Sequence, residues 1–173
     1  EEEGRRGVLA AVPLSEVTLL PEQDEYLGYK LERLRLPRDE IVAVSIGVAY
    51  HREEIEAIPN GWHANKPLNS RWDSYVRAYQ QVNQVLSRIA SYLADSFGGV
   101  AERATMDGLV GQVSHVTQYF PHCVSHRAIA EAAGLGWRGK HGLIVTPEFG
   151  PALRLASFFF FGRLESQRHE LSG

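Results

Sequence analysis

The sequence predicts a protein of the α/β or α+β class, because strand patterns and helix patterns alternate along one chain of 173 residues. Residues 41–50, IVAVSIGVAY, form a nearly continuous apolar and β-branched run, which is typical of a strand covered on both faces. Residues 72–97 instead repeat apolar side chains three or four positions apart, which is the spacing of one helix face.

Shorter patterns predict the other elements. Strands are expected at 5–14, 100–106, 142–146 and 152–161, and helices at 21–36 and 121–134. The polar segment 51–71 is long for a connection, so it is expected to be a functional lid or a mobile loop. Only PEFGP separates 142–146 from 152–161, and so short a link implies an antiparallel hairpin. The central sheet, flanked by helices, is therefore predicted to be mixed.

The composition of the chain limits the classes of protein to which it can belong. With 44% apolar residues the chain can form one core, so residues 1–161 are expected to be one domain and 162–173 a polar tail or linker. The net charge of −3 argues against a dedicated nucleic-acid binder. The single cysteine, Cys123, excludes a four-cysteine iron–sulfur cluster within this chain. No signal peptide and no long apolar run is visible, which favours a cytoplasmic protein without a membrane partner.

Residues 134–142, GLGWRGKHG, carry the G-x-x-x-x-G-K pattern of a phosphate-binding loop. A P-loop needs Ser or Thr after the lysine, and here that position is His141. The segment also follows a predicted helix and precedes a predicted strand, which is the reverse of the P-loop order. Gly134 is expected instead to cap the preceding helix in a left-handed conformation. The other glycines would let the backbone approach a flat or bulky group, and Trp137 either covers a flat cofactor or closes a sheet edge.

Several histidines lie in the same part of the chain: His115, His122, His126 and His141. His122 and His126 are four apart on a predicted helix and so share a face. The pair supplies only two ligands and no H-E-x-x-H motif is present, so no metal site is assigned. These histidines are interpreted as polar pocket or surface groups, or as a proton donor or anion contact, since a free imidazole ordinarily titrates near pH 7.

The segment 133–157, AGLGWRGKHGLIVTPEFGPALRLAS, resembles a segment of epoxyqueuosine reductases and of related corrinoid-dependent reductases, including reductive dehalogenases. The matching motifs are AGLGW, the following GK and TPEFG, and a weaker similarity extends over most of 41–161. The resemblance implies a nitroreductase-like sandwich that binds cobalamin, a corrinoid. It also implies that a ferredoxin-type module with 4Fe–4S clusters, which this chain does not contain, delivers electrons to the cobalt.

The resemblance implies cofactor contacts by His126, Gly134, Leu135, Gly136, Trp137, Gly139 and Lys140. In that interpretation the backbone amides of the glycine-rich loop approach the edge of the corrin and its amide side chains. Lys140 donates to an anionic or carbonyl group of the ligand.

The resemblance also implies a proton donor above the cobalt. Epoxyqueuosine reductases carry an aspartate at the position that falls on Phe120 here, so that aspartate is missing. Reductive dehalogenases are thought to use a tyrosine in the corresponding pocket, which makes Tyr119 the first candidate and His122 the second. The missing aspartate and the negative charge make tRNA a less favoured partner than a corrinoid and a ferredoxin-type donor.

Three functions stay open at this point. The first is the corrinoid-binding domain of an oxidoreductase related to epoxyqueuosine reductase. The second is a corrinoid carrier or sensor that does not catalyse a reaction. The third is an FMN-binding oxidoreductase of the nitroreductase type, because a fold does not fix a function.

Overall fold

The computed structural model describes residues 4–32, 37–56, 69–104 and 123–164, and for residues 69–74 it describes the backbone alone. The strands are β1 (Gly7–Pro13), β2 (Ile41–Ala49), β3 (Val100–Glu102), β4 (Trp137–Arg138), β5 (Ile144–Val145) and β6 (Leu153–Phe161). The α-helices are α1 (Pro21–Leu31), α2 (Arg52–Glu56), α3 (Asn69–Ser96) and α4 (His126–Ala132). Two short 3₁₀ helices are η2 (Leu14–Glu16) and η4 (Arg38–Glu40).

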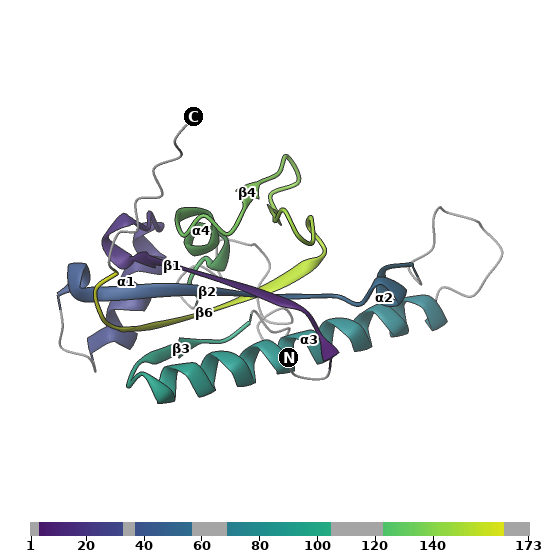
Figure 1. Cartoon of the computed structure of the whole chain (residues 1–173), viewed down its shortest axis with the longest axis horizontal. Coiled ribbons are helices and arrows are strands. Elements are labelled where there is room, and N and C mark those ends of the chain that lie inside the picture. Colours follow the sequence, from purple (N-terminus) through teal and green to yellow (C-terminus); the bar gives the residue numbers. More distant parts are fainter. Residues whose placement is uncertain (1–3, 33–36, 57–68, 105–122, 165–173) are drawn as a thin grey trace, which may run out of the picture.

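The main sheet has the strand order β1-β2-β6-β3 (Figure 1). Each neighbouring pair in it is antiparallel. The α+β class is therefore confirmed, and the expectation of a mixed sheet is wrong for the strands that the structure describes. Strand β6 pairs with β2 along its whole length on one edge and with β3 at residues 157–159 on the other, and no pairing with β5 occurs in the described residues. The expected pairing of 142–146 with 152–161 is thus also wrong, and β5 pairs with β4.

Strand β2 lies at the centre of the sheet, and all nine of its residues are buried. Its apolar run was expected to be covered on both faces, and this is confirmed. Alternate side chains point to opposite faces because successive residues of a strand do so. Val44 and Ile46 belong to the core cluster under α3, whereas Ile41 and Ala43 belong to a second cluster on the other face.

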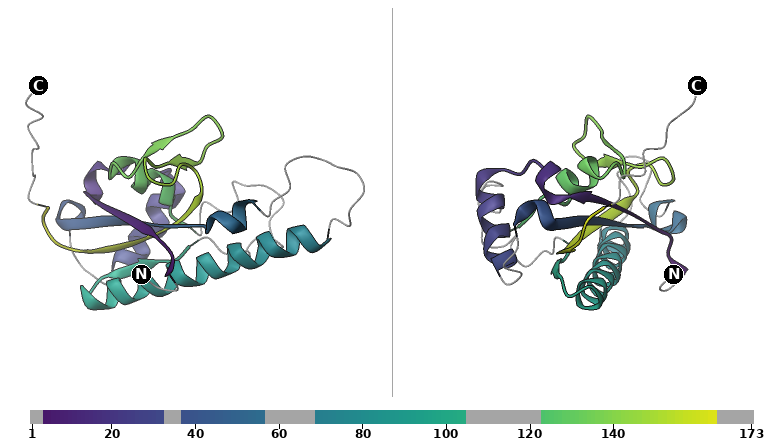
Figure 2. Two further views of the ribbon diagram at one scale, coloured as in Figure 1. Left: turned by 45° about the vertical axis from the view of Figure 1, so that its right-hand side comes forward. Right: turned by 60° about the vertical axis from the view of Figure 1, so that its left-hand side comes forward.

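Helix α3 covers one face of the sheet along its length (Figure 2). Its buried apolar side chains are Ala78, Val82, Val85, Leu86, Ala90 and Ala94. The helix expected over 72–97 is thus confirmed, and it ends where Gly98 adopts a positive φ of 65°. The amide of Gly99 closes the last turn on the carbonyl of Ala94 at 2.6 Å.

The opposite face is covered by α1, η2 and α4. Helix α1 begins with Pro21 in its first turn, as Pro favours, and ends at Leu31, before the predicted end at 36. Helix α4 begins at His126, later than the predicted 121, because Ser125 accepts a hydrogen bond from the amide of Ala128 at 3.2 Å and so acts as its N-cap.

The C-terminus of α4 has the geometry of a Schellman motif. Gly134 has a φ of 71°, and its amide donates to the carbonyl of Glu131 at 3.1 Å. The amide of Leu135 donates to the carbonyl of Ala130 at 2.9 Å, and the two side chains pack together with Ile144. The expected helix cap at Gly134 is confirmed, and it turns the chain directly into β4.

Part of the segment 51–71 is helical, since it contains α2 and the first turn of α3, while residues 57–68 lie outside the described residues. Helix α2 is attached to the N-terminal segment by Arg5, whose guanidinium donates to both carboxylate oxygens of Glu54, at 2.9 and 2.7 Å. In the described parts of the chain, no helix combines the length and the apolar character that crossing a bilayer requires.

Candidate functional site

The glycine-rich segment 134–142 forms most of a hairpin that projects beside α4 (Figures 1 and 2). Its strands pair Trp137 with Val145 and Arg138 with Ile144. The turn is closed by the amide of Gly139, which donates to the carbonyl of Leu143 at 2.9 Å. The segment is therefore an ordered turn, which we call the β4–β5 hairpin.

Most of the glycines in this hairpin are explained by the protein's own backbone. A Cβ atom at Gly136 would lie 2.2 Å from the carbonyl oxygen of Val145, so only glycine lets β4 approach β5. A Cβ atom at Gly139 would lie 2.7 Å from the ring of His141. Gly142 has a φ of 78°, a conformation that side chains rarely adopt.

Several amides that were expected to face a ligand are used inside the protein. The amides of Gly134 and Leu135 close the end of α4, and that of Gly139 closes the hairpin turn. They cannot donate to a bound group in this conformation. At Gly136, the close backbone approach that glycine permits is that of β4 to β5.

The side chains of the hairpin divide between its two faces. Ile144 is 3% exposed and packs toward the sheet, so the opposite face points outward. By the pairing of the strands, Trp137, Val145 and Leu143 share that outward face. Trp137 is 56% exposed and Leu143 is 50% exposed. Together these three residues form the outer strip of the hairpin, and the ammonium-bearing Lys140 is exposed in the turn beside it.

Two arginine contacts hold the hairpin against α4. The guanidinium of Arg127 donates to the carbonyl of Gly142 at 2.6 Å. Arg138 pairs with Glu131 at 2.9 Å, and both side chains are partly exposed, so this pair adds little stability. The outer strip therefore sits on a hairpin that is fixed at both its base and its turn.

His126 is the first residue of α4, and its side chain is buried in the core. Its Nε2 atom is 3.0 Å from the carbonyl oxygen of Arg103, and its Nδ1 atom is 3.0 Å from Oγ of Ser157. A carbonyl only accepts, so Nε2 carries the proton and Nδ1 accepts from the Ser157 hydroxyl. Burial lowers the pKa of His126 to about 4, so the ring is neutral at pH 7. His126 was expected to contact a cofactor, but in this structure both of its nitrogens are occupied within the protein.

The two candidate proton donors, Tyr119 and His122, lie outside the described residues, and so does His115. Their roles stay predictions. The described chain resumes at Cys123, whose side chain is half-buried and whose pKa is raised, first by burial and then by the charge of Glu102.

A buried ionic cluster, which the sequence patterns did not reveal, holds the segment that precedes α4. Glu102 of β3 is 6% exposed and accepts hydrogen bonds from the Lys30 ammonium and, at 3.5 Å, from the Tyr26 hydroxyl. The amide of Val124 donates to the same carboxylate. Burial raises the pKa of Glu102 although these donors oppose the shift. The only available signal was an acidic residue in a predicted strand, because its side-chain partners Lys30 and Tyr26 are 72 and 76 positions away in sequence.

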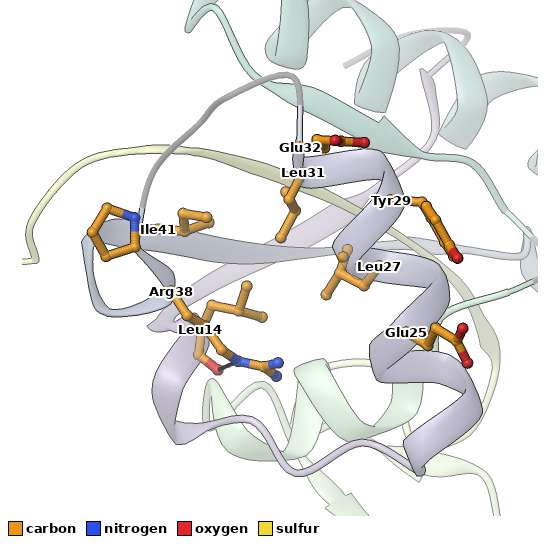
Figure 3. Close-up of a pocket in the computed structure, with 10 residues that line it drawn as sticks. Leu14, Glu25, Leu27, Tyr29, Leu31, Glu32, Arg38 and Ile41 are labelled. Carbon is orange, nitrogen blue, oxygen red and sulfur yellow. Dashed lines mark hydrogen bonds between the residues drawn. The ribbon is translucent and has the colours of Figure 1, made fainter.

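A cavity of about 720 Å³ lies elsewhere, between α1, η2 and the start of β2 (Figure 3). Its apolar floor is formed by Leu14, Leu27 and Ile41, and Tyr29 and Glu32 stand at its rim. None of its described lining residues belongs to the β4–β5 hairpin or to α4. The cavity and the residues predicted to bind a cofactor are therefore separate.

In the part of the chain that the structure describes, no group of three or more His, Cys, Asp or Glu side chains is placed to hold a metal ion.

Comparison with known proteins gives one informative similarity. No family model matches the chain. The chain is similar to epoxyqueuosine reductase of Listeria monocytogenes, with 27% identity over 107 residues. This similarity covers 62% of the present chain and 25% of the relative, so the chain corresponds to about a quarter of that protein's length.

The residues can be tested against the corrinoid that the sequence resemblance implied. The outer strip offers an exposed indole and aliphatic side chains, which would contact the apolar parts of such a macrocycle. Lys140 could donate to an amide or an anion on such a ring. The amides of Gly134, Leu135 and Gly139 and the ring of His126 do not fit that role, because each already has a partner. Among the described groups of the hairpin, its exposed side chains, and not these amides, are therefore the groups that would be available to such a ligand.

Proposed function

We propose that this chain is the cofactor-binding part of an oxidoreductase related to epoxyqueuosine reductase, and that it binds a corrinoid against the outer strip of the β4–β5 hairpin. The similarity to the Listeria monocytogenes enzyme supports a reductase relative. The observation that carries the proposal is the position of Trp137, whose side chain is 56% exposed on a hairpin fixed to α4.

Exposure of a tryptophan side chain to water is unfavourable, and a ligand that covers the indole removes that unfavourable contact. The β4–β5 pairing and the Arg127 contact with Gly142 limit the motion of the hairpin, so little further ordering is needed when a flat group binds. Trp137 and Leu143 would cover one edge of the corrin, and Lys140 would donate to one of its amide or anionic groups. The bound cobalt would supply the redox chemistry, with electrons from an iron–sulfur module outside this chain.

The proton that the reduction requires would come from the segment before α4. Tyr119 and His122 are the candidates for this proton transfer. The described end of that segment is held by Glu102, which accepts the amide of Val124 and is itself paired with Lys30. The segment is thus fixed at residue 124, two positions after His122.

Titration with cobalamin, followed by its visible spectrum, tests the binding. Trp137→Ala should weaken binding about 30-fold, which corresponds to about 2 kcal/mol of apolar contact. Tyr92→Ala is the matched control, because Tyr92 is 72% exposed on α3 and lies outside the outer strip. Equal affinity of the two variants, or no spectral change with the unmodified protein, would contradict the proposed corrinoid site.

Binding and turnover measurements on the same preparation distinguish the other two candidate functions. A protein that binds FMN and not cobalamin is a nitroreductase-type oxidoreductase. A corrinoid carrier would bind cobalamin but show no turnover when the complete protein is given a chemical reductant. In an active protein, Tyr119→Phe and His122→Gln should separate the two candidate acids, and full activity in both variants would exclude the proton-transfer assignment.

A further inference from the structure

Strand β1 forms one edge of the main sheet, and half of its backbone points away from β2. The amide of Ala49 donates to the carbonyl of Arg6 at 3.0 Å, which makes Arg6 and Ala49 a hydrogen-bonded pair. Because such pairs alternate along antiparallel strands, Val8, Ala10 and Val12 face β2. The amides and carbonyls of Gly7, Leu9 and Ala11 therefore point outward, and within the described residues no hydrogen bond reaches them.

The two edge strands of the sheet differ in how well they are protected against pairing with another strand. Edge strand β3 has only three residues, and the ammonium of Lys30 donates to the carbonyl of Ala101 at 3.3 Å. Edge strand β1 has seven residues, GVLAAVP, with no charged side chain and a proline only at its end. Charges, prolines and shortness are the usual means of preventing an edge from pairing with another strand. Strand β1 lacks them over six consecutive residues.

Leu9 adds an apolar contact at the middle of this edge. Its side chain is 67% exposed, the largest value among the aliphatic side chains that the structure describes. It shares a face with Ile46, its partner in β2, but α3 packs against β2, β6 and β3 and leaves Leu9 uncovered. Outward backbone groups and an uncovered leucine thus occur together at residues 7–11.

We propose that β1 pairs antiparallel with β1 of a second copy of this chain, and that Leu9 faces its own equivalent across the two-fold axis. The outward residues Gly7, Leu9 and Ala11 are centred on Leu9, so this register alone pairs all three. It places each Gly7 opposite Ala11 of the other copy, which puts small side chains on both sides of the leucine pair. Shifting the register by two residues loses a pair and leaves each leucine opposite a small residue.

The surface area that this contact buries is small, and this limits the affinity of the dimer. A stable dimer buries about 800 Å² on each partner, and one strand edge buries less than that. We therefore expect a reversible dimer with a dissociation constant on the order of 0.1–1 mM. This inference is independent of the proposed corrinoid site, because the outer strip contains no residue of β1.

Sedimentation velocity from about 10 µM to about 1 mM tests the dimer. The unmodified chain should sediment faster as its concentration rises, and Leu9→Lys should weaken the association at least about tenfold, because it places two charges opposite each other. Tyr92→Lys, which changes a side chain exposed on α3, should behave like the unmodified chain. Circular dichroism verifies that each variant is folded. A chain that stays monomeric at about 1 mM, or Leu9→Lys that associates normally, overturns the proposal.

Cysteine substitution tests the register. In the proposed pairing the two Leu9 Cα atoms lie about 5.5 Å apart, so Leu9→Cys should form a disulfide-linked dimer on oxidation. The two Ala11 positions are offset by four residues, or about 13 Å, so Ala11→Cys should not. The unmodified chain controls for linkage through Cys123. Crosslinking of Ala11→Cys in preference to Leu9→Cys excludes this register.

Discussion

The two faces of the main sheet hold their helices by different means. Toward α3 the contact is mainly apolar, with Val44 and Phe158 of the sheet packed against Leu86 on the helix. One hydrogen bond joins β6 to this helix, from Nε of Arg154 to Oδ1 of the buried Asn83 at 2.9 Å. Toward α4 the sheet presents two fully buried serines, Ser45 and Ser157, side by side in adjacent strands. His126 at the start of α4 hydrogen-bonds to Ser157.

The difference matters for where each helix can sit. Apolar packing is proportional to buried area and has little direction, so the Arg154–Asn83 hydrogen bond is the directional contact in the core between the sheet and α3 that the described residues show. A hydrogen bond has a preferred distance and angle, and leaving it unmade in the core costs about 1–3 kcal/mol. The polar face thus fixes the orientation of α4 and, through Gly134 and Leu135, the direction in which the β4–β5 hairpin leaves the helix.

The largest effect is expected on the apolar face. Phe158 is 3% exposed and lies 5.7 Å from the ring of Phe160, so Phe158→Ala should lower the free energy of unfolding by about 4 kcal/mol. Urea unfolding followed by circular dichroism measures this. Since no titrating group is removed, the loss should be equal at pH 7 and pH 5. A loss below about 1 kcal/mol would show that the packing on this face is loose.

The contribution of the polar face to the stability of the fold should be recognised by its dependence on pH. The pKa of His126 is about 4 in the folded protein and 6.5 in an unfolded chain, so the unfolded chain binds the extra proton between these values. The stabilisation is complete above pH 6.5, falls as the pH is lowered, and is lost by about pH 4, by roughly 3 kcal/mol in all. His126→Gln should be less stable at pH 7 and lack this part of the slope. Equal slopes in the two proteins would contradict the assigned burial.

A smaller effect is expected where the hairpin leaves α4. Gly136→Ala places a methyl group against the carbonyl of Val145 and should cost about 2 kcal/mol. The control is Gly28→Ala, because Gly28 lies in α1 with open space around it and should gain up to about 1 kcal/mol in helix propensity. Thermal unfolding compares the two directly. A neutral Gly136→Ala would mean that β4 can move away from β5 at little cost.

The smallest effect concerns the second serine of the polar face. Ser45 is fully buried, and its hydroxyl has no hydrogen-bond partner among the described residues. Ser45→Ala removes that hydroxyl and should be neutral or stabilise the fold by up to about 1 kcal/mol. Ser157→Ala, which leaves Nδ1 of His126 without a donor, should destabilise it. If both alanine variants destabilise equally, the two serines are equivalent and the contrast between them is wrong.

Local patterns predicted the elements whose contacts are dense or close in sequence. The apolar run of β2 reflects burial on both faces of the sheet, the spacing of α3 reflects one buried helix face, and Gly134 reflects a local backbone requirement. The pairing of β5 could not be read in this way. The short PEFGP link favoured β6 as the partner of β5, but β5 pairs with β4, and β6 pairs with β2 and β3, which are far away in sequence.

The site was predicted less completely for a similar reason. The motif drew attention to the hairpin, and Trp137 is exposed there as a ligand contact requires. The glycines were interpreted as space for a ligand, but at Gly136 the space is taken by Val145. His126 fitted a surface pattern with His122, yet its partners are Ser157 and a carbonyl at 103, and neither is visible from helical spacing.

The central position of β2 has a consequence for the order in which the molecule opens. Its amides are bonded to neighbours on both edges, and its side chains are covered on both faces, so local fluctuations cannot release them. Hydrogen exchange at these amides should therefore require global unfolding and report its full free energy. The amides of the two-residue strands β4 and β5 need less of the structure to open and should exchange sooner, although the Arg127 contact holds the hairpin in its average position.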